Sequence, residues 1–274
     1  MRPILLLLII TLAPVLGYSA DDFSVDGGAD VTPRISIIID DMGNRLREGS
    51  AAIALPGELT FAVLPHTTFS KRLATAAHDA GKEVMLHQPM EAITGNHLLG
   101  EGGITLDMTQ RDIERTLRRN LASVPFTVGI NNHMGSLMTR HPGNMAWLMA
   151  VLKRRGDLYF IDSKTTAESI AAQVADEYEI PSSQRNIFLD HNINHDAIKE
   201  QFSRLIRKAK LTGSAIGIGH PHPETIAVLK ELLPDLEQQG IKLIPVSEMI
   251  QYREVWSPIV WQASLSPSRP DSKN

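Results

Sequence analysis

The chain has 274 residues, of which 43% are hydrophobic and 21% are charged, and its formal net charge is −4. This is the composition of an ordinary globular domain with one substantial core. Cysteine is absent, which excludes a disulfide framework and thiol chemistry. The negative net charge and the lack of a dense basic patch argue against nucleic acid as the main partner, so we expect no nucleic-acid partner.

Residues 1–20 have the pattern of a secretory signal peptide. Arg2 supplies one positive charge, residues 4–16 form an almost uninterrupted apolar run, and small residues follow. The run is shorter than the ~20 residues that a membrane-spanning helix needs. We therefore expect cleavage near Gly17 or Ala20, no transmembrane domain in the mature chain, and an exported, periplasmic location. An uncleaved membrane anchor is the alternative.

The rest of the chain divides into a spacer, one domain and a tail. Residues 21–33 are acidic and lack apolar periodicity, which is typical of a flexible spacer. Residues 34–253 are expected to form the domain, and residues 254–274, which contain several prolines and serines, a loose tail. Within the domain, short apolar runs predict strands at 35–40, 59–64, 83–87, 127–130, 158–161, 187–189, 215–218 and 241–245.

Helical patterns lie between these strands. Thr109 with Asp112 three residues later is an N-cap signature, and apolar residues recur every four positions behind it. Two more helices are predicted over residues 145–155 and 224–239, because each pattern ends at a glycine. Eight strands that alternate with helices predict an α/β domain with a parallel, barrel-like sheet.

Two adjacent carboxylates, Asp40 and Asp41, end the first predicted strand. The isoleucine-rich run before them is typical of a strand that is buried on both faces, and ligands bind at the carboxyl ends of such strands. Neighbouring strand residues point to opposite sides, so one carboxylate can ligate a metal while the other acts on a water molecule. The alternative is that Asp-Asp-Met-Gly simply forms a turn, since Asp and Gly favour turns.

Histidine or aspartate residues also follow five other predicted strands. They are His87, His133, Asp162, the pair Asp190 and His191, and the pair His220 and His222. Any one of these is more often a satisfied polar residue than a ligand, but together they would converge on one face of a barrel. With Asp41 among them, the pattern indicates a divalent metal bound by imidazole and carboxylate, for which zinc is the natural candidate.

Several of these segments resemble a known family. Residues 37–43, Ile-Ile-Ile-Asp-Asp-Met-Gly, resemble the first motif of the polysaccharide deacetylases. Residues 86–91, 129–136 and 219–225 are similar to the divergent polysaccharide deacetylase family, often labelled YibQ-like and related to the NodB-type deacetylases of carbohydrate esterase family 4. The resemblance implies a distorted (β/α) barrel of seven to eight parallel strands, an exported location and one divalent metal, with Zn²⁺ expected.

The resemblance also implies roles for individual residues. Asp40 matches the family's general base and Asp41 its aspartate ligand, while His87 matches the first histidine of the metal motif. Glu91 stands where that motif has its second histidine, so it is a candidate ligand, and His133 is a further candidate to complete the metal sphere.

His220 lies where related deacetylases place their general acid, and His222 is the alternative. Asn131 and Asn132 are candidates for hydrogen bonds to a sugar or for orienting an imidazole, or they shape a loop. With these two asparagines, His222 completes the candidate substrate-binding set. The Arg-x-Pro-x-Gly motif, whose arginine restrains the base in the family, is not visible in this sequence.

Three functions follow as hypotheses. The first is a metal-dependent hydrolase that removes acyl groups, such as acetyl, from an envelope polysaccharide or a peptidoglycan-type glycan. The second is a non-catalytic glycan-binding or regulatory envelope protein with the same fold, which Glu91 and the absent arginine motif favour. The third is a metal-dependent phosphoesterase, against which the lack of a glycine-rich phosphate loop or an arginine cluster argues.

The leader gives the first testable prediction. If the apolar run of residues 4–16 is the core of a signal peptide, the mature chain begins just after Gly17 or Ala20 and is found outside the cytoplasm. Mass spectrometry of the N-terminus and fractionation of expressing cells measure both. Recovery of the intact chain from the cytosol would refute this assignment.

Overall fold

The computed structural model describes the backbone of residues 32–265 and the side chains of residues 32–255. The expected signal peptide, nearly all of the expected spacer and residues 266–274 of the expected tail lie outside this range. The helix α8 (Val246–Leu265) continues beyond the domain boundary expected at residue 253, so the first part of the expected tail is helical. In the described part of the chain, no helix is both long and apolar enough to cross a membrane.

Parallel strands form a single sheet, and eight of them follow one another in the order β6-β5-β4-β3-β2-β1-β8-β7, with β9 pairing β1 from outside this path. This curled half-barrel confirms the barrel of seven to eight parallel strands. The strands are β1 (Arg34–Met42), β2 (Thr60–Val63), β3 (Glu83–Met90), β4 (Thr127–Met134), β5 (Tyr159–Asp162), β6 (Ser182–Gln184), β7 (Ile187–Phe188), β8 (Ser214–Gly219) and β9 (Lys242–Leu243).

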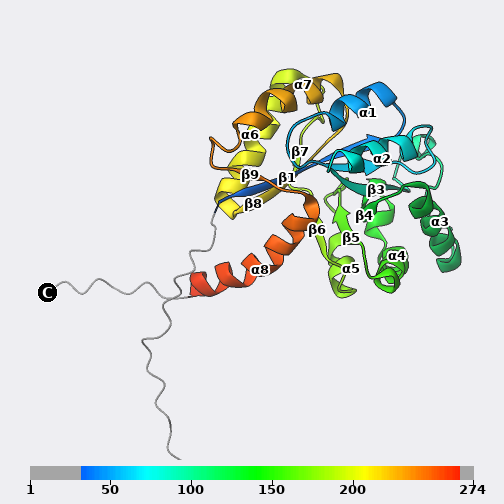
Figure 1. Ribbon diagram of the computed structural model, residues 1–274. Helices are drawn as coiled ribbons and strands as arrows, with labels where there is room; N and C mark the ends of the chain where they lie inside the picture. The colour runs from blue at the N-terminus through cyan, green and yellow to red at the C-terminus, as the bar shows by residue number, and fades with distance from the viewer. Residues whose placement is uncertain (1–31, 266–274) are drawn as a thin grey trace, which may run out of the picture. The chain divides into compact units, whose positions relative to one another are not determined.

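Helices α1 to α7 cover the outside of the curled sheet, whereas the first turns of α8 pack against its inner face (Figure 1). In chain order they are α1 (Leu46–Ile53), α2 (Ser70–Asp79), α3 (Gln110–Ser123), α4 (Pro142–Arg155), α5 (Ala171–Glu177), α6 (His195–Thr212), α7 (Pro223–Leu232) and α8, with short 3₁₀ turns η1 (Asn96–Leu98), η2 (Met138–Arg140) and η3 (Leu233–Asp235). Each polar strand end is therefore followed by a loop that leads into a covering helix, and the loops gather at one end of the barrel.

The isoleucines of β1 explain its central position. Ile35, Ile37 and Ile39 belong to the core between the sheet and the outer helices. Ile38 points the other way, into a second core that fills the inside of the barrel together with the start of α8. The strand is thus buried on both faces, which confirms the prediction from its uninterrupted apolar run.

The helix predictions succeed where the local signals are strong. Thr109 and Asp112 form the expected capping box at the start of α3. Helix α4 ends at Gly156, which adopts a left-handed φ of 77°. The predicted helix over residues 224–239 is too long: α7 ends at Leu232, and Pro234 lies in the 3₁₀ turn that follows, where its missing N–H ends the helical hydrogen-bond pattern.

Two strand predictions need correction. The strand β6 was not expected, because its polar residues Ser182–Gln184 carry no apolar alternation. Strand β3 continues to Met90 and β4 to Met134, so His87 lies inside its strand rather than at the end, and Asn131 and His133 lie within β4 rather than after it. Pairing of β3 with β4 supplies the backbone hydrogen bonds that hold these polar residues in extended structure.

Glu83, the first residue of β3, connects the start of this strand to the first turn of helix α8. Its carboxylate accepts hydrogen bonds from Thr60 Oγ1 at 2.9 Å, Tyr159 Oη at 2.8 Å and the backbone N–H of Val246 at 3.0 Å. The N–H of Ser247 also approaches the same carboxylate, at 3.3 Å. One ionised side chain thus satisfies donors from β2, β5 and the first turn of α8, where a negative charge is favoured by the helix dipole.

We predict that Glu83→Ala lowers the free energy of unfolding by about 2–4 kcal/mol, because it leaves several buried donors without an acceptor. Glu83→Gln should lose less, since its amide oxygen can still accept. Urea denaturation followed by circular dichroism measures both. Glu237→Ala is a matched control, because Glu237 is exposed and its carboxylate makes no hydrogen bond or ion pair with the described residues. Equal stability of Glu83→Ala and this control would contradict the assigned role.

Candidate functional site

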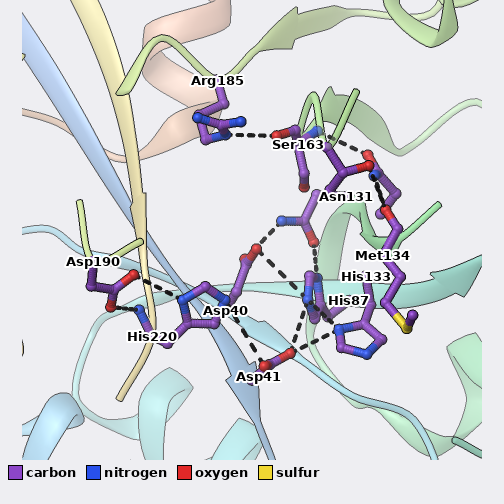
Figure 2. A network of polar contacts seen from close by, with 12 residues as sticks. Asp40, Asp41, His87, Asn131, His133, Met134, Ser163, Arg185, Asp190 and His220 are labelled. Atoms are coloured by element: carbon purple, nitrogen blue, oxygen red, sulfur yellow. Dashed lines mark hydrogen bonds and ion pairs between the residues drawn. The ribbon is translucent and has the colours of Figure 1, made fainter. Parts of the chain in front are cut away.

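The polar residues predicted at the strand ends come together at the open end of the barrel. Asp40 and Asp41 lie on β1, His87 on β3, His133 on β4, and His220 directly after β8 (Figure 2). These strands are neighbours in the sheet order β4-β3-β2-β1-β8, which brings side chains far apart in the sequence into contact. The structure therefore forms the polar cluster that the sequence pattern predicts.

Asp41, His87 and His133 present three ligand atoms to a common point. Asp41 Oδ1 lies 2.9 Å from His133 Nδ1 and 3.2 Å from His87 Nε2. The two imidazole nitrogens are 3.2 Å apart. Ligands bound to a tetrahedral zinc ion at ~2.0–2.1 Å are about 3.3 Å from each other, so these three atoms already have the spacing of one face of such a site.

The hydrogen bonds around Asn131 fix which nitrogen of His87 carries its proton. Asn131 Nδ2 donates to Asp40 Oδ1 at 2.8 Å, which leaves Asn131 Oδ1 as an acceptor. His87 Nδ1 lies 2.7 Å from this oxygen and must donate to it. In neutral His87 the lone pair of Nε2 therefore points toward Asp41.

Asp41 Oδ1 is shielded from solvent, and no well-directed hydrogen bond satisfies it. Burial opposes ionisation of Asp41, but His133 and His87 outweigh this effect and hold the pKa of its carboxyl well below the ordinary value. Burial opposes protonation of His87, but Asp40 and Asp41 outweigh it and raise the pKa of this imidazole. Nε2 of His87 and Oδ1 of Asp41, 3.2 Å apart, therefore need a positive charge between them, which a proton or a bound cation supplies. The residues present thus fit a divalent metal ion.

An irregularity in β1 directs the Asp41 side chain to this point. The pairing register with β2 shifts between Ile39 and Met42, and Asp41 has a φ of 56°, in the left-handed region. Such a conformation costs a residue other than glycine roughly 1–2 kcal/mol, and bulges of this kind re-aim side chains beside active sites. The turn suggested by Asp-Asp-Met-Gly is therefore present, but as a bulge that serves the candidate ligand.

Gly43 completes the irregularity, and a side chain cannot replace its hydrogen. A Cβ at Gly43 would lie 2.1 Å from Thr67 Oγ1, and the residue has a φ of 130°. The backbone of Gly43 also accepts a hydrogen bond from Phe69 N at 2.9 Å. The glycine of the motif is thus required by close approach to the loop after β2.

Asp40 faces the same histidine as Asp41, because the bulge turns Asp41 toward it, and Asp40 is only 3% exposed. Burial raises the pKa of Asp40 above its ordinary value, although His87, His220 and the hydrogen bond from Asn131 oppose the shift. Its Oδ2 is 3.7 Å from His87 Nε2, so the carboxylate sits directly beside the candidate metal ligands. A buried carboxyl group with a raised pKa has the environment of a general base.

His220 is held by Asp190. Its Nδ1 lies 3.0 Å from Asp190 Oδ1, and its backbone N–H donates to Asp190 Oδ2 at 2.6 Å. Thr225 Oγ1 also donates to Asp190, at 2.8 Å. Burial alone would lower the pKa of His220, but the contact with Asp190 raises it to about 9. Such an imidazole retains its proton near neutral pH and can act as a general acid.

His222 lies beside this pair. Ligand atoms of Asp190, His220 and His222 fall within 4.8 Å of one another, so these residues form a second candidate cation group. Both oxygens of Asp190 are already occupied by His220 and Thr225, which favours a hydrogen-bonded acid pair over a metal site. His222 is partly exposed at the start of α7, where a substrate group can reach it.

Glu91 is not brought to the three candidate ligands, so the structure does not support it as a fourth. The chain turns after β3, because Glu91 N donates to Ile104 O and Glu91 O accepts from Leu137 N and Met138 N. Its carboxylate is thereby directed to the backbone N–H of Leu106, which donates to Oε2 at 2.7 Å.

Of the roles open to the two asparagines of β4, the structure favours orienting an imidazole for Asn131 and shaping loops for Asn132 over hydrogen bonds to a sugar. Asn131 is fully buried and joins Asp40 to His87, so it orients a base and a ligand. Asn132 is 1% exposed, accepts from Ser163 N at 2.8 Å and donates to Met134 O at 2.7 Å. Successive strand residues point to opposite faces, and the amide of Asn132 therefore fixes loops instead of contacting a ligand.

Arg185 is a site residue that the sequence did not indicate. It follows the short strand β6 and donates to Ser163 O at 2.6 Å and to Lys164 O at 2.7 Å (Figure 2). Its positive charge interacts with Asp40, although burial lowers the pKa of its guanidinium. An isolated arginine in a polar segment carries no sequence signal, so its contacts with the loop after β5 become visible only in the structure.

Comparison with known proteins places these features in a family. The model of the family described as divergent polysaccharide deacetylase matches residues 37–250. The protein YibQ of Escherichia coli K12, described as uncharacterized, is 36% identical over 222 residues, which cover 81% of this chain and 69% of that protein.

Solved structures share the fold. The uncharacterized protein ATU2773 of Agrobacterium tumefaciens superimposes with a TM-score of 0.76 at 22% identity, over 80% of this chain and 89% of that one. The peptidoglycan deacetylase PdaC of Bacillus subtilis gives 0.54 at 10% identity, over 87% and 100%. BA3943 of Bacillus anthracis, described as a pseudoenzyme of the CE4 family, gives 0.51 at 14%, over 80% and 66%. With a family match over most of its length and a relative above 30% identity, the chain belongs to the divergent polysaccharide deacetylase family.

Proposed function

We propose that this protein is a metal-dependent hydrolase that removes acyl groups, such as acetyl, from an envelope polysaccharide or peptidoglycan-type glycan. The observation that carries the proposal is the triangle of ligand atoms from Asp41, His87 and His133, placed beside the buried Asp40. Family membership supports a glycan as substrate, as does the fold shared with PdaC, a peptidoglycan deacetylase. A periplasmic location follows from the leader pattern of the sequence.

Asp41, His87 and His133 would hold the metal, with zinc proposed from the imidazole and carboxylate donor set. When bound, the ion lowers the pKa of a water molecule and polarises the acyl carbonyl. Asn131 keeps His87 in the tautomer that offers Nε2 to the ion, through the hydrogen bond at Nδ1. Because the same amide donates to Asp40, ligand and base are positioned by one buried side chain.

Asp40 would accept the proton of the attacking water as the new carbon–oxygen bond forms. Its raised pKa brings its proton affinity closer to that task at neutral pH. His220 would then donate its proton to the leaving nitrogen as the carbon–nitrogen bond breaks, which yields a carboxylate and an amine. Asp190 holds His220 oriented and protonated before the transfer and stabilises the ring during it.

A non-catalytic glycan-binding or regulatory envelope protein is the second candidate. The CE4 fold occurs in the pseudoenzyme BA3943, so the fold by itself does not establish hydrolysis. The same polar groups that would catalyse can also bind a sugar, and the two functions differ in turnover alone.

Metal binding gives a direct prediction. His87→Ala removes one of three ligands and should abolish stoichiometric zinc binding, and Asn131→Ala should weaken affinity by about 10- to 100-fold, because it frees the His87 ring. Elemental analysis and competition with a chelating dye measure these changes. His78→Ala is the control, since His78 stacks on Phe126 outside this cluster. Full zinc occupancy in His87→Ala would show that the ligand assignment is wrong.

Catalysis gives a second prediction. Asp40→Asn should retain zinc and lower kcat by about 10²- to 10⁴-fold, because the amide introduced cannot take a proton but can accept the Asn131 hydrogen bond. His220→Ala should lower kcat with little loss of zinc. Acetate released from chitooligosaccharides and peptidoglycan fragments is the assay.

Loss of zinc in Asp40→Asn would instead mean that Asp40 is itself a ligand. If the wild-type protein binds one of these glycans but releases no acetate, the non-catalytic function replaces the hydrolase.

A further inference from the structure

A cavity of about 300 Å³ adjoins the candidate ligand His133. Its wall is formed by Asn44, the loop of residues 64–68 after β2, Pro89 and the segment of residues 98–101. This volume is at the lower end of the range for ligand pockets. It is much larger than an acetyl group needs and has room for about one sugar ring with its substituents.

The loop that forms the cavity is locked to the strand that carries Asp41. Leu64 N donates to Met42 O at 2.8 Å, and Phe69 N donates to Gly43 O at 2.9 Å. Thr67 packs so closely on Gly43 that no Cβ fits there. The cavity wall and the candidate metal centre therefore form one rigid arrangement.

His66 is the most unusual residue of the wall. It has a left-handed φ of 57°, a conformation that residues other than glycine adopt rarely and that collects at functional sites. Its Nε2 lies 2.8 Å from the Oδ1 of Asn120, which is fully buried in α3. The hydrogen bond with Asn120 therefore holds the ring in place, while the residue itself is only half-buried.

The hydrogen bonds of Asn120 set the tautomer of His66. Asn120 Nδ2 donates to Gln88 Oε1 and to Gly102 O, both at 2.8 Å, so Asn120 Oδ1 is an acceptor. His66 Nε2 must donate to it, and Nδ1 of the neutral ring carries a lone pair. Among the described residues, none donates to this Nδ1. A ligand hydroxyl or amide N–H can satisfy it.

The position of the cavity relative to His220 indicates which part of a glycan it would hold. Strand order places the ends of β2, β3 and β4 on one side of β1 and β8, with His220, on the other. The nitrogen that His220 protonates, and the sugar attached to it, belong on the β8 side. The cavity lies on the opposite side, next to His133.

We propose that this cavity is a subsite for a sugar residue that flanks the one attacked, and that His66 selects it by accepting a hydrogen bond from a hydroxyl or acylamino N–H through Nδ1. The polar wall, which includes Asn44, Thr67, Thr68 and Glu101, suits a hydroxylated ring better than an extended acyl chain. The proposal rests on the proposed function, because it takes a glycan as the substrate. It implies that the protein prefers an oligosaccharide over a monosaccharide.

The test is a comparison of two ligands by isothermal titration calorimetry on zinc-loaded Asp40→Asn protein, which binds without turnover. N-acetylglucosamine should bind more weakly than its β-1,4-linked tetramer. Adding His66→Asn should weaken tetramer binding by about 2- to 12-fold, the loss of one hydrogen bond, and leave the monomer unchanged. Asparagine tolerates the left-handed conformation, so this change preserves the loop.

Asn44→Ala gives a second variant that leaves His66 in place, and it should weaken tetramer binding in the same direction. His78→Asn is the matched control and should leave the affinity for both the monomer and the tetramer unchanged. Unchanged tetramer binding in both His66→Asn and Asn44→Ala would overturn the subsite. Equal losses for monomer and tetramer would also overturn it, because the cavity would then hold the attacked residue or its acyl group.

The subsite and the proposed hydrolase function can be refuted separately. One outcome is that the wild-type protein releases acetate from the tetramer while His66→Asn and Asn44→Ala, each added to Asp40→Asn, bind the tetramer as tightly as Asp40→Asn alone. In that case the subsite is wrong and the proposed function stands. If no glycan binds and no acetate is released, both are wrong.

Discussion

The whole site depends on sending two adjacent carboxylates of one strand into different surroundings. A regular strand would already point Asp40 and Asp41 to opposite faces, but the bulge after Ile39 also brings Asp41 to His87 and His133. Their environments then separate them chemically. The pKa of Asp41 is held low by two imidazoles, whereas burial raises the pKa of Asp40. Pairs of like groups with pKa values driven apart are the usual basis of divided roles in catalysis.

Buried amides connect these groups to the fold. Asn131 joins Asp40 to His87, and Asn120 joins His66 to Gln88, which is the residue after His87 on β3. An amide both donates and accepts, so each one fixes the tautomer of an imidazole without adding charge to the interior. The buried amide side chains of β3 and β4, those of Gln88, Asn131 and Asn132, thus have hydrogen-bond partners, which allows polar residues in the centre of a parallel sheet.

The sequence predicted the fold and the members of the cluster, because both depend on periodic or local signals. Apolar runs marked the strands, and histidine or aspartate followed them in chain order. The sequence did not predict the orientations of side chains that depend on contacts between distant segments. Asn131 and Asn132 are adjacent residues of the same type, and the sequence does not distinguish them. Because successive strand residues point to opposite faces, Asn131 contacts Asp40 in the site and Asn132 contacts a loop. Arg185 lies in a segment with no pattern, and the direction of Glu91 depends on a backbone bridge to Ile104.

The direction of Glu91 also bears on the choice between enzyme and binding protein. The departure from the family's second histidine would argue for lost activity if that position had to hold the metal. Here the Glu91 carboxylate accepts from Leu106 N, and His133 on β4 brings a third candidate ligand atom to Asp41 and His87, at distances close to those between two ligands of one zinc ion. We infer that the ligand set has moved from one strand to its neighbour rather than been lost. The position of Glu91 therefore does not by itself decide between an enzyme and a binding protein. The guanidinium of Arg185 donates to Ser163 O and Lys164 O, so it does not replace the missing arginine motif by a direct contact with Asp40.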